Sequence, residues 1–369
     1  MLLTPKVLTS SLVHPTHKTP CNRKAATCRQ RRALCQAQAD AAQSVSSPGN
    51  PLLMAAVESL FRFPPFFSMA AKNARSMIVK RAESIGLDWD SAMRERQQQD
   101  WQSLMRQVSN PNVQYPAYYE QPFHAYPSGN LCMEAALEVT MAAKSVHALV
   151  MDPAGKTLDP EGDENMRSSY GARMLECMSE LDVDAASLKD AVDMGCATGL
   201  SSLALLRTMP NAETRVTGVD LSPHFLAVGT WEQQRREETK APGSPAEPLH
   251  FIHAAAEDTG LPSSSYDLVS VCLVCHELPQ AASKAVFAEA HRLLRPGGCL
   301  SIMEMNPRSP AFGRIMGNPF AYTAFKSTEP WLQEYITLDM HAAIQEVGFG
   351  RPVEKECTPR HRTVVAVKH

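Results

Sequence analysis

From residue 188 onward, apolar runs of strand length alternate with longer amphipathic stretches. Five apolar runs rich in β-branched residues predict strands at residues 190–194, 215–219, 249–254, 267–274 and 299–304. Two further runs, 353–357 and 363–367, predict a closing antiparallel pair. Strands that alternate with helices form parallel sheets covered on both faces. We therefore expect an α/β fold with a doubly wound, mostly parallel seven-stranded sheet, an antiparallel last strand and an N-terminal helical extension.

Two stretches near the C-terminus interrupt this alternation. The helix expected over residues 280–294 ends in the turn Pro296-Gly297-Gly298. A Pro-, Gly- and Phe-rich insertion then occupies residues 306–335. Its aromatic side chains either line an apolar pocket or pack an extra helix.

The first half of the chain divides into segments of different character. Residues 40–110 predict a polar linker followed by N-terminal helices, and residues 111–187 predict a helical extension or lid. Four of the eight tyrosines lie between residues 115 and 126, in a Pro-containing stretch that cannot form one regular helix. This tyrosine cluster, and Tyr170, either cover a binding site or pack against the sheet edge. Residues 188–369 form the main domain.

Charge is distributed unevenly along the chain. Residues 1–39 hold seven basic side chains and no acid, and they are rich in Ser, Thr and Arg. These features are typical of an organelle transit peptide, and the Ser, Thr and Pro content favours the chloroplast over the mitochondrion. An ordinary basic tail is the alternative. Residues 40–369 keep 29 of the 36 basic and all 39 acidic side chains, a net charge of −10. That acidic body argues against nucleic acid as a partner.

Neither a metal site nor a membrane span is expected. Cys272 and Cys275 form a C-x-x-C pair inside a predicted buried strand, and no second pair or histidine partner completes a zinc site. We therefore predict core cysteines and no metal. No apolar stretch of the sequence reaches the length of a spanning helix.

The strongest chemical signal lies where the first of these strands meets a helix. The run from Asp193 to Gly199 has small residues at Gly195, Ala197 and Gly199. Small residues let a ligand approach the backbone, and a helix N-terminus presents free N–H groups. The run does not match the G-x-G-x-x-G spacing of a dinucleotide site. A carboxylate at Asp193 would repel a pyrophosphate but suits a ligand with an amino group.

Further carboxylates follow the second and third strands. Asp220 ends the second strand, where a carboxylate accepts hydrogen bonds from ribose hydroxyls. Because Ser222 already supplies a helix N-cap, a purely capping role for Asp220 is less favoured. After the third strand, residues 256–258 present backbone N–H groups and a carboxylate to an adenine edge.

Together these motifs resemble the class I S-adenosylmethionine-dependent methyltransferases, in the type 11 group that includes the ubiquinone and menaquinone C-methyltransferases. A narrower resemblance, to a plant and algal chloroplast group of methyltransferases, rests on residues 118–126, 275–277, 327–330 and 359–363. The resemblance implies S-adenosylmethionine as the cofactor. The cofactor-binding residues that it implies are Asp193, Gly195, Cys196, Ala197, Gly199, Asp220, Leu221, Ala256, Glu257, Asp258 and Cys275.

Two residues after the fourth strand are the candidate catalytic groups. His276 and Glu277 occupy the position that, by the resemblance, faces the transferred methyl group. They either bind the acceptor and remove its proton, or simply begin a helix. We expect methyl transfer to a small-molecule acceptor, preferably aromatic or prenylated, in the plastid. The alternatives are an inactive cofactor-binding assembly or regulatory protein, a protein methyltransferase and an NAD-dependent oxidoreductase. The sequence leaves the oligomeric state open.

Overall fold

The computed structural model describes residues 64–124, 126–241 and 243–369 of the chain. The expected transit peptide at residues 1–39 and the linker at 40–50 lie outside these ranges. The helices before the sheet are α3 (Pro64–Ser84), α4 (Trp89–Gln97), α5 (Trp101–Val108), α6 (Met133–His147) and α7 (Gly162–Glu180). None of the described helices is long and apolar enough to cross a membrane.

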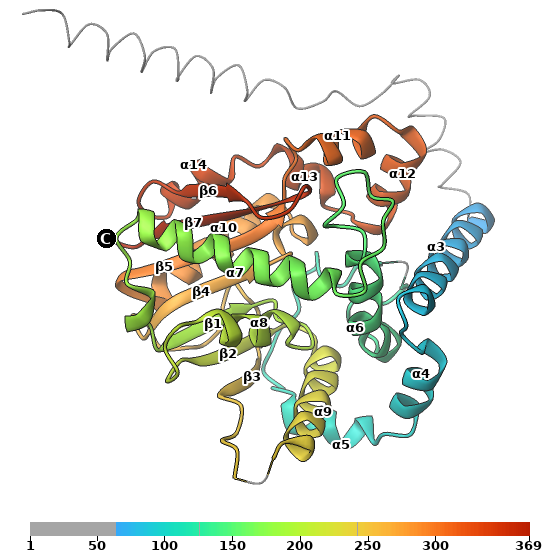
Figure 1. Cartoon of the computed structure of the whole chain (residues 1–369), viewed down its shortest axis with the longest axis horizontal. Coiled ribbons are helices and arrows are strands. Elements are labelled where there is room, and N and C mark those ends of the chain that lie inside the picture. Colours follow the sequence, from blue (N-terminus) through green and yellow to red (C-terminus); the bar gives the residue numbers. More distant parts are fainter. Residues whose placement is uncertain (1–63, 125, 242) are drawn as a thin grey trace, which may run out of the picture. The chain divides into compact units, whose positions relative to one another are not determined.

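Seven strands form one sheet in the order β3-β2-β1-β4-β5-β7-β6 (Figure 1). Their bounds are β1 (Asp190–Met194), β2 (Arg215–Asp220), β3 (Leu249–His253), β4 (Tyr266–Cys272), β5 (Leu294–Met305), β6 (Val353–Glu356) and β7 (His361–Val367). The first five strands pair in parallel, and β7 runs antiparallel to both β5 and β6. The expected mostly parallel sheet with an antiparallel last strand is confirmed.

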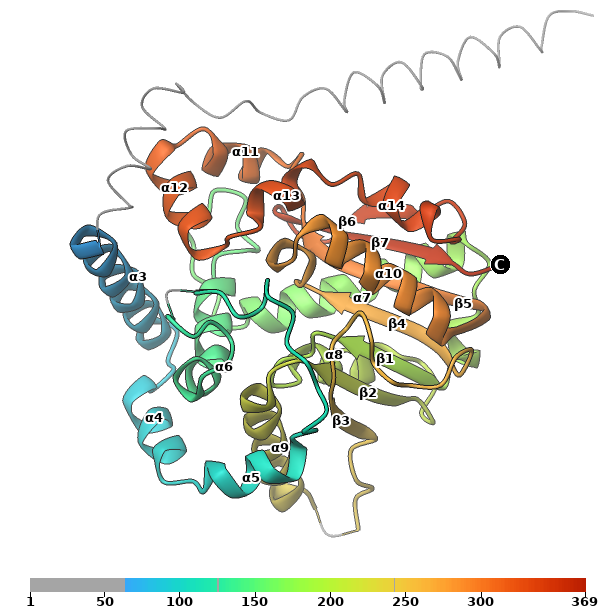
Figure 2. The same cartoon turned by 180° about the vertical axis from the view of Figure 1, so that it is seen from behind.

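Helices cover both faces of this sheet (Figures 1 and 2). The helices within the sheet region are α8 (Leu200–Thr208), α9 (Pro223–Thr239), α10 (Gln280–Leu293) and α14 (Met340–Glu346). Successive strand residues point to opposite faces. Val192 of β1 therefore packs with Phe287 of α10 in one apolar cluster, while its neighbour Ala191 packs with Met174 of α7 in the other. Burial on both faces explains why the central strand β4 and residues 299–303 of β5 are almost continuously apolar.

Two of the expected boundaries are wrong. Strand β4 ends at Cys272 instead of residue 274, because Leu273 adopts a left-handed backbone with φ of 59°. Cys275 consequently opens the short 3₁₀-helix η2 (Cys275–Glu277) instead of lying in a strand. The turn Pro296-Gly297-Gly298 lies inside β5, where the Gly297 N–H donates to the Lys368 carbonyl at 2.7 Å. Pairing with the end of the chain thus continues the strand through a sequence that usually ends one.

The insertion after β5 forms three helices, α11 (Pro310–Met316), α12 (Pro319–Thr328) and α13 (Leu332–Thr337). Phe312, Tyr322 and Tyr335 are buried in the same apolar cluster as the α10 face of the sheet. Phe320 is exposed. Of the two interpretations of its aromatic residues, helix packing therefore accounts for most of them.

Candidate active site

The sequence-predicted residues gather at the carboxyl ends of the parallel strands. Because β1 to β5 are parallel, the loops that follow them meet at the carboxyl ends of the strands. Residues 195–199, which we call the glycine-rich turn, follow β1. Asp220 ends β2, and residues 256–258 follow β3. His276 and Glu277 follow β4 in η2.

The glycine-rich turn has three left-handed residues in alternation. Gly195, Ala197 and Gly199 have φ of 71°, 48° and 90°. The N–H groups of Gly195 and Cys196 donate to the Val219 carbonyl at 2.8 and 3.1 Å, which fixes the turn to the end of β2. A Cβ on Gly195 would lie 2.5 Å from Val274 Cγ2. Glycine at 195 is therefore demanded both by backbone conformation and by close packing.

Asp193 lies below this turn and is completely buried. Its Oδ2 accepts hydrogen bonds from Ser201 Oγ at 2.6 Å and Ser202 Oγ at 2.7 Å. Its Oδ1 has no hydrogen-bond partner among the described residues. Burial raises the pKa of Asp193, although the two serine hydroxyls oppose the shift. A buried carboxylate oxygen without a donor fits the amino end of S-adenosylmethionine, reached directly or through a water.

Asp220 is nearly buried and joins the glycine-rich turn to the start of α9. Its Oδ2 accepts the Ala197 N–H at 2.8 Å, and its Oδ1 accepts the Ser222 N–H at 2.8 Å. Burial raises the pKa of Asp220 to about 6, while these N–H donors oppose the shift. An ionised carboxylate can accept about four hydrogen bonds. Asp220 therefore has a capping role and retains acceptor capacity for ribose hydroxyls.

The remaining sequence-predicted cofactor residues contribute unequally. Cys196, Leu221 and Cys275 are buried, so their side chains pack beneath the site. Glu257 accepts a hydrogen bond from the Tyr118 hydroxyl. Asp258 is exposed, and Ala256 lies between the two bridge partners Ala255 and Asp258. The loop after β3 thus offers mainly backbone groups to an adenine edge.

His276 forms a buried pair with Glu304, a residue near the end of β5. Its Nδ1 lies 2.9 Å from Glu304 Oε1, and its backbone N–H donates to Glu304 Oε2 at 3.2 Å. Burial alone would lower the pKa of His276, but the Glu304 carboxylate outweighs it and raises the pKa to about 10. At neutral pH the imidazole is consequently protonated and stays paired with Glu304. The Tyr335 ring lies edge-on against it, with 6.3 Å between the ring centroids.

Glu277 is the second ionisable group at the end of β4. Its Oε2 accepts one long hydrogen bond, 3.4 Å, from Asn130 Nδ2. Burial raises the pKa of Glu277 to about 7, against the opposing effect of His124 and His276. A carboxyl group with a pKa near neutrality is suited to proton transfer.

A segment between α5 and α6 crosses the carboxyl ends of the strands (Figure 2). We call residues 110–131, apart from 125, the lid segment. The Tyr115 hydroxyl lies 3.3 Å from His253 Nε2 at the end of β3, and Tyr118 contacts Glu257. At the other end, the Asn130 carbonyl accepts from Ser222 Oγ at 2.6 Å. Tyr115 and Tyr118 therefore cover the carboxyl ends of the strands, whereas Tyr126 donates to Glu138 of α6 and Tyr170 packs on the sheet.

The lid segment also contacts the insertion. His124 Nε2 lies 2.8 Å from Glu329 Oε1, the residue that follows α12. The His124 N–H donates to the Thr328 carbonyl at 3.1 Å. These contacts bring a second histidine–carboxylate pair close to His276 and Glu277, because His124 and Glu329 both act on the pKa of Glu277.

Sequence reasoning missed four of these residues: Asn130, His124, Glu329 and Glu304. Glu304 is an acid within the otherwise apolar run 299–304, and His124 and Glu329 lie in the segments 118–126 and 327–330 of the narrower resemblance, but none of the three was assigned a role. His124 and Glu329 are 205 positions apart and carry no pattern that links them. Among the described residues, no group of three or more His, Cys, Asp and Glu side chains is arranged to hold a metal ion.

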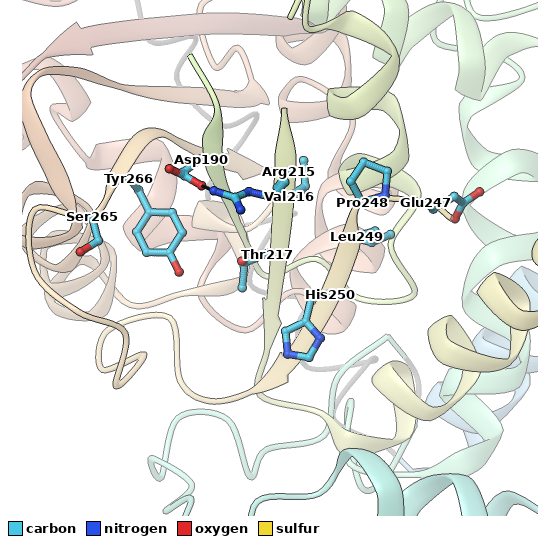
Figure 3. Close-up of a pocket in the computed structure, with 10 residues that line it drawn as sticks. All are labelled: Asp190, Arg215, Val216, Thr217, Glu247, Pro248, Leu249, His250, Ser265 and Tyr266. Carbon is cyan, nitrogen blue, oxygen red and sulfur yellow. Dashed lines mark hydrogen bonds and ion pairs between the residues drawn. The ribbon is translucent and has the colours of Figure 1, made fainter. Parts of the chain in front are cut away.

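A separate pocket lies at the amino ends of the strands, on the side of the sheet opposite the candidate site (Figure 3). It is lined by the first residues of four strands, including Asp190, Arg215, Leu249 and Tyr266. Arg215 is already paired with Asp190 at 2.6 Å. Because this pocket lies at the amino ends, it shares no residue with the site at the carboxyl ends.

Comparison with known proteins agrees with this geometry. Residues 192–302 match the family described as a methyltransferase domain. The chain is 23% identical over 163 residues to an uncharacterized methyltransferase of Synechocystis, covering 43% of this chain and 65% of that protein. It is 32% identical over 121 residues to a demethylmenaquinone methyltransferase of Chlorobaculum parvum, covering 32% of this chain and 43% of that protein. The matched region thus spans less than two thirds of either relative.

A solved structure, the CurJ carbon methyltransferase, aligns with a TM-score of 0.45 and 16% identity, covering 86% of this chain and 96% of that one. The matched family region runs from β1 to the middle of β5 and contains the glycine-rich turn, Asp220, His276 and Glu277. Residues 192–302 therefore match a methyltransferase domain, and the buried acceptor oxygen of Asp193 fits S-adenosylmethionine as its cofactor.

Proposed function

We propose that the protein transfers a methyl group from S-adenosylmethionine to a small-molecule acceptor that loses a proton in the reaction. The observation that carries this proposal is the position of Glu277. It lies beside the His276–Glu304 pair at the end of β4, and Val274 of the same loop packs against the glycine-rich turn. The residues expected to bind the cofactor are thus adjacent to Glu277, the residue expected to face the acceptor.

The residues of this chain would divide the work as follows. S-adenosylmethionine supplies an electrophilic methyl group on a sulfonium. Asp193 and Asp220 hold the two polar ends of the cofactor, and the lid segment excludes water. Glu277 accepts the proton that the acceptor loses when its new bond to the methyl carbon forms. The His276 imidazolium, fixed by Glu304, keeps a positive charge next to Glu277 and stabilises its carboxylate form.

An aromatic or prenylated acceptor is our preferred class. Tyr118 and Tyr119 lie in the segment that covers the site, and burial raises the pKa of both hydroxyls. These phenols therefore stay neutral and offer flat apolar surface to an acceptor. The Chlorobaculum relative, a demethylmenaquinone methyltransferase, is consistent with this preference.

We further propose that the protein works in the chloroplast. The support is the basic, acid-free composition of residues 1–39. A fusion of residues 1–45 to a fluorescent reporter should enter plastids. A mitochondrial or cytosolic signal would refute this part of the proposal without affecting the enzymatic part.

The enzymatic proposal is tested by incubating the full chain with methyl-labelled S-adenosylmethionine and a plastid extract. We expect label in a low-molecular-weight product, identified by mass spectrometry. Label in protein would favour a protein methyltransferase instead. If calorimetry shows cofactor binding but no fraction of the extract becomes labelled, an assembly or regulatory role replaces the catalytic one.

A further inference from the structure

We propose that Glu277 and Glu329 form a paired-carboxylate subsite that binds a hydroxyl or amine hydrogen-bond donor of the acceptor and rejects acceptors with an anionic group there. This inference rests on the proposed function and deepens it, because it names the chemical class of the acceptor.

The first observation is a buried oxygen of Glu329. This residue follows α12 and is 4% exposed. Its Oε1 is occupied by His124 Nε2 at 2.8 Å, whereas Oε2 has no hydrogen-bond partner within the described part of the chain. Leaving a buried acceptor without a donor is unfavourable, and more so when the acceptor is charged. A donor on a bound molecule would remove that cost.

The second observation concerns Glu277, whose short helix η2 packs against α13, the helix that begins three residues after Glu329. The one hydrogen bond of Glu277 in the described structure is the 3.4 Å contact from Asn130, which is long for a charge-assisted bond. Glu329 raises the pKa of Glu277 and also acts on His276, so the two carboxylates are within electrostatic range of each other and of the imidazole. Two under-satisfied carboxylates therefore belong to segments that are packed together, one to η2 and one to the insertion.

The third observation concerns the positive charges nearby. His124 is paired with Glu329, and His276 is paired with Glu304. Arg362, the arginine that acts on Glu304, is paired with Glu354 at 3.1 Å. Each of these cations already has a carboxylate partner. A carboxylate or phosphate on the acceptor would meet Glu277 and Glu329 without a matching cation, which is repulsive in a poorly solvated site.

The test uses the full chain and a plastid small-molecule extract divided by anion exchange into retained and unretained fractions. With methyl-labelled S-adenosylmethionine, we expect the labelled product to arise from the unretained, non-anionic fraction. The same assay is run on Glu329→Gln and on Glu238→Gln, an identical change at an exposed position near the end of α9. Glu329→Gln should raise KM for the acceptor at least about tenfold, the size expected for loss of a charged hydrogen bond. Glu238→Gln should match the wild type.

Cofactor binding, measured by calorimetry, should be the same in all three proteins, which shows that each is folded. A product derived from the retained, anionic fraction overturns the inference and leaves the proposed function intact. Equal KM values for Glu329→Gln and Glu238→Gln also overturn it. If the wild type binds cofactor and labels neither fraction, the proposed function itself fails, and the inference fails with it.

Discussion

The imidazole of His276 and the carboxylate of Glu304 meet across the ends of two neighbouring strands, with Nδ1 2.9 Å from Oε1. The register of the sheet produces this contact. Cys272, the last residue of β4, is aligned with Met303 of β5, so the residue after Met303 lies beside the chain that leaves β4. A buried pair of this kind is strongly affected by loss of either partner.

Replacing Glu304 by Gln should lower the pKa of His276 from about 10, because the carboxylate that most opposes burial is lost and only Glu329 and Glu277 still raise it. The pair stabilises the fold fully below pH 6.5 and stops doing so as the pH rises through about 10. Glu304→Gln should therefore cost about 3 kcal/mol of unfolding free energy at neutral pH. NMR titration of His276 and denaturant unfolding measure the two effects. Glu346→Gln, in an exposed pair with Lys284, should change neither.

Glu277 should control the pH dependence of activity. The carboxylate form accepts the proton, so the rate should rise with pH through about 7. His124, His276, Glu329 and Asp220 all act on this pKa, so the midpoint belongs to the cluster. Glu277→Gln should lower kcat at least about 100-fold, in line with the loss of a general base. A pH–rate profile that is flat between pH 6 and 8 would contradict this role.

The same substitution should stabilise the protein at high pH. A raised folded pKa means that the contribution of Glu277 to stability is present below its ordinary pKa of 4.5 and is lost as the pH rises through about 7. Because glutamine does not ionise, Glu277→Gln should not lose stability over this pH range. At pH 8 the variant should unfold at a higher denaturant concentration than the wild type. A lower midpoint would show that Glu277 serves the fold instead of the reaction.

Asp220→Asn should weaken S-adenosylmethionine binding by about tenfold or more, because a charged acceptor for ribose hydroxyls is lost. Wild-type affinity should also fall as the pH drops below about 6, where Asp220 becomes protonated. Asp267→Asn is the matched control at the amino end of β4, where Asp267 accepts the Lys189 N–H and pairs with Arg295. It should lower stability while leaving calorimetric affinity unchanged; equal affinity losses in both variants would exclude a specific role for Asp220.

Positions 195 and 197 of the glycine-rich turn should respond in opposite directions. Gly195→Ala places a methyl group 2.5 Å from Val274 Cγ2 at a φ of 71°, so it should destabilise the fold and abolish cofactor binding. Ala197→Gly relieves a left-handed alanine with φ of 48° and should leave binding intact, with a stability gain below about 1 kcal/mol. Thermal unfolding with and without cofactor measures both, and a stable, binding-competent Gly195→Ala would refute the close-packing argument.

The sequence by itself determined the sheet and its cofactor edge. Periodicity gives β1 to β5 and the helices between them, because burial on both faces demands long apolar runs. The residues at strand ends, such as Asp193 and Asp220, follow from that, since parallel strands bring their carboxyl ends together. The strand boundaries predicted from local sequence were wrong where the backbone conformation or a distant hydrogen-bond partner decided them. Leu273 ends β4 early, and pairing with Lys368 carries β5 through Pro296-Gly297-Gly298.

Only the tertiary structure decided the acceptor side. Glu304 lies beside His276 because of strand register, and Glu329 lies beside His124 because the insertion folds back onto the lid segment. These contacts join residues from 28 to 205 positions apart, over which sequence spacing carries no geometric information. The pKa values of His276 and Glu277 depend in turn on that burial and on those neighbours. The cofactor site is thus a property of local strand ends, and the chemistry opposite it is a property of the assembled fold.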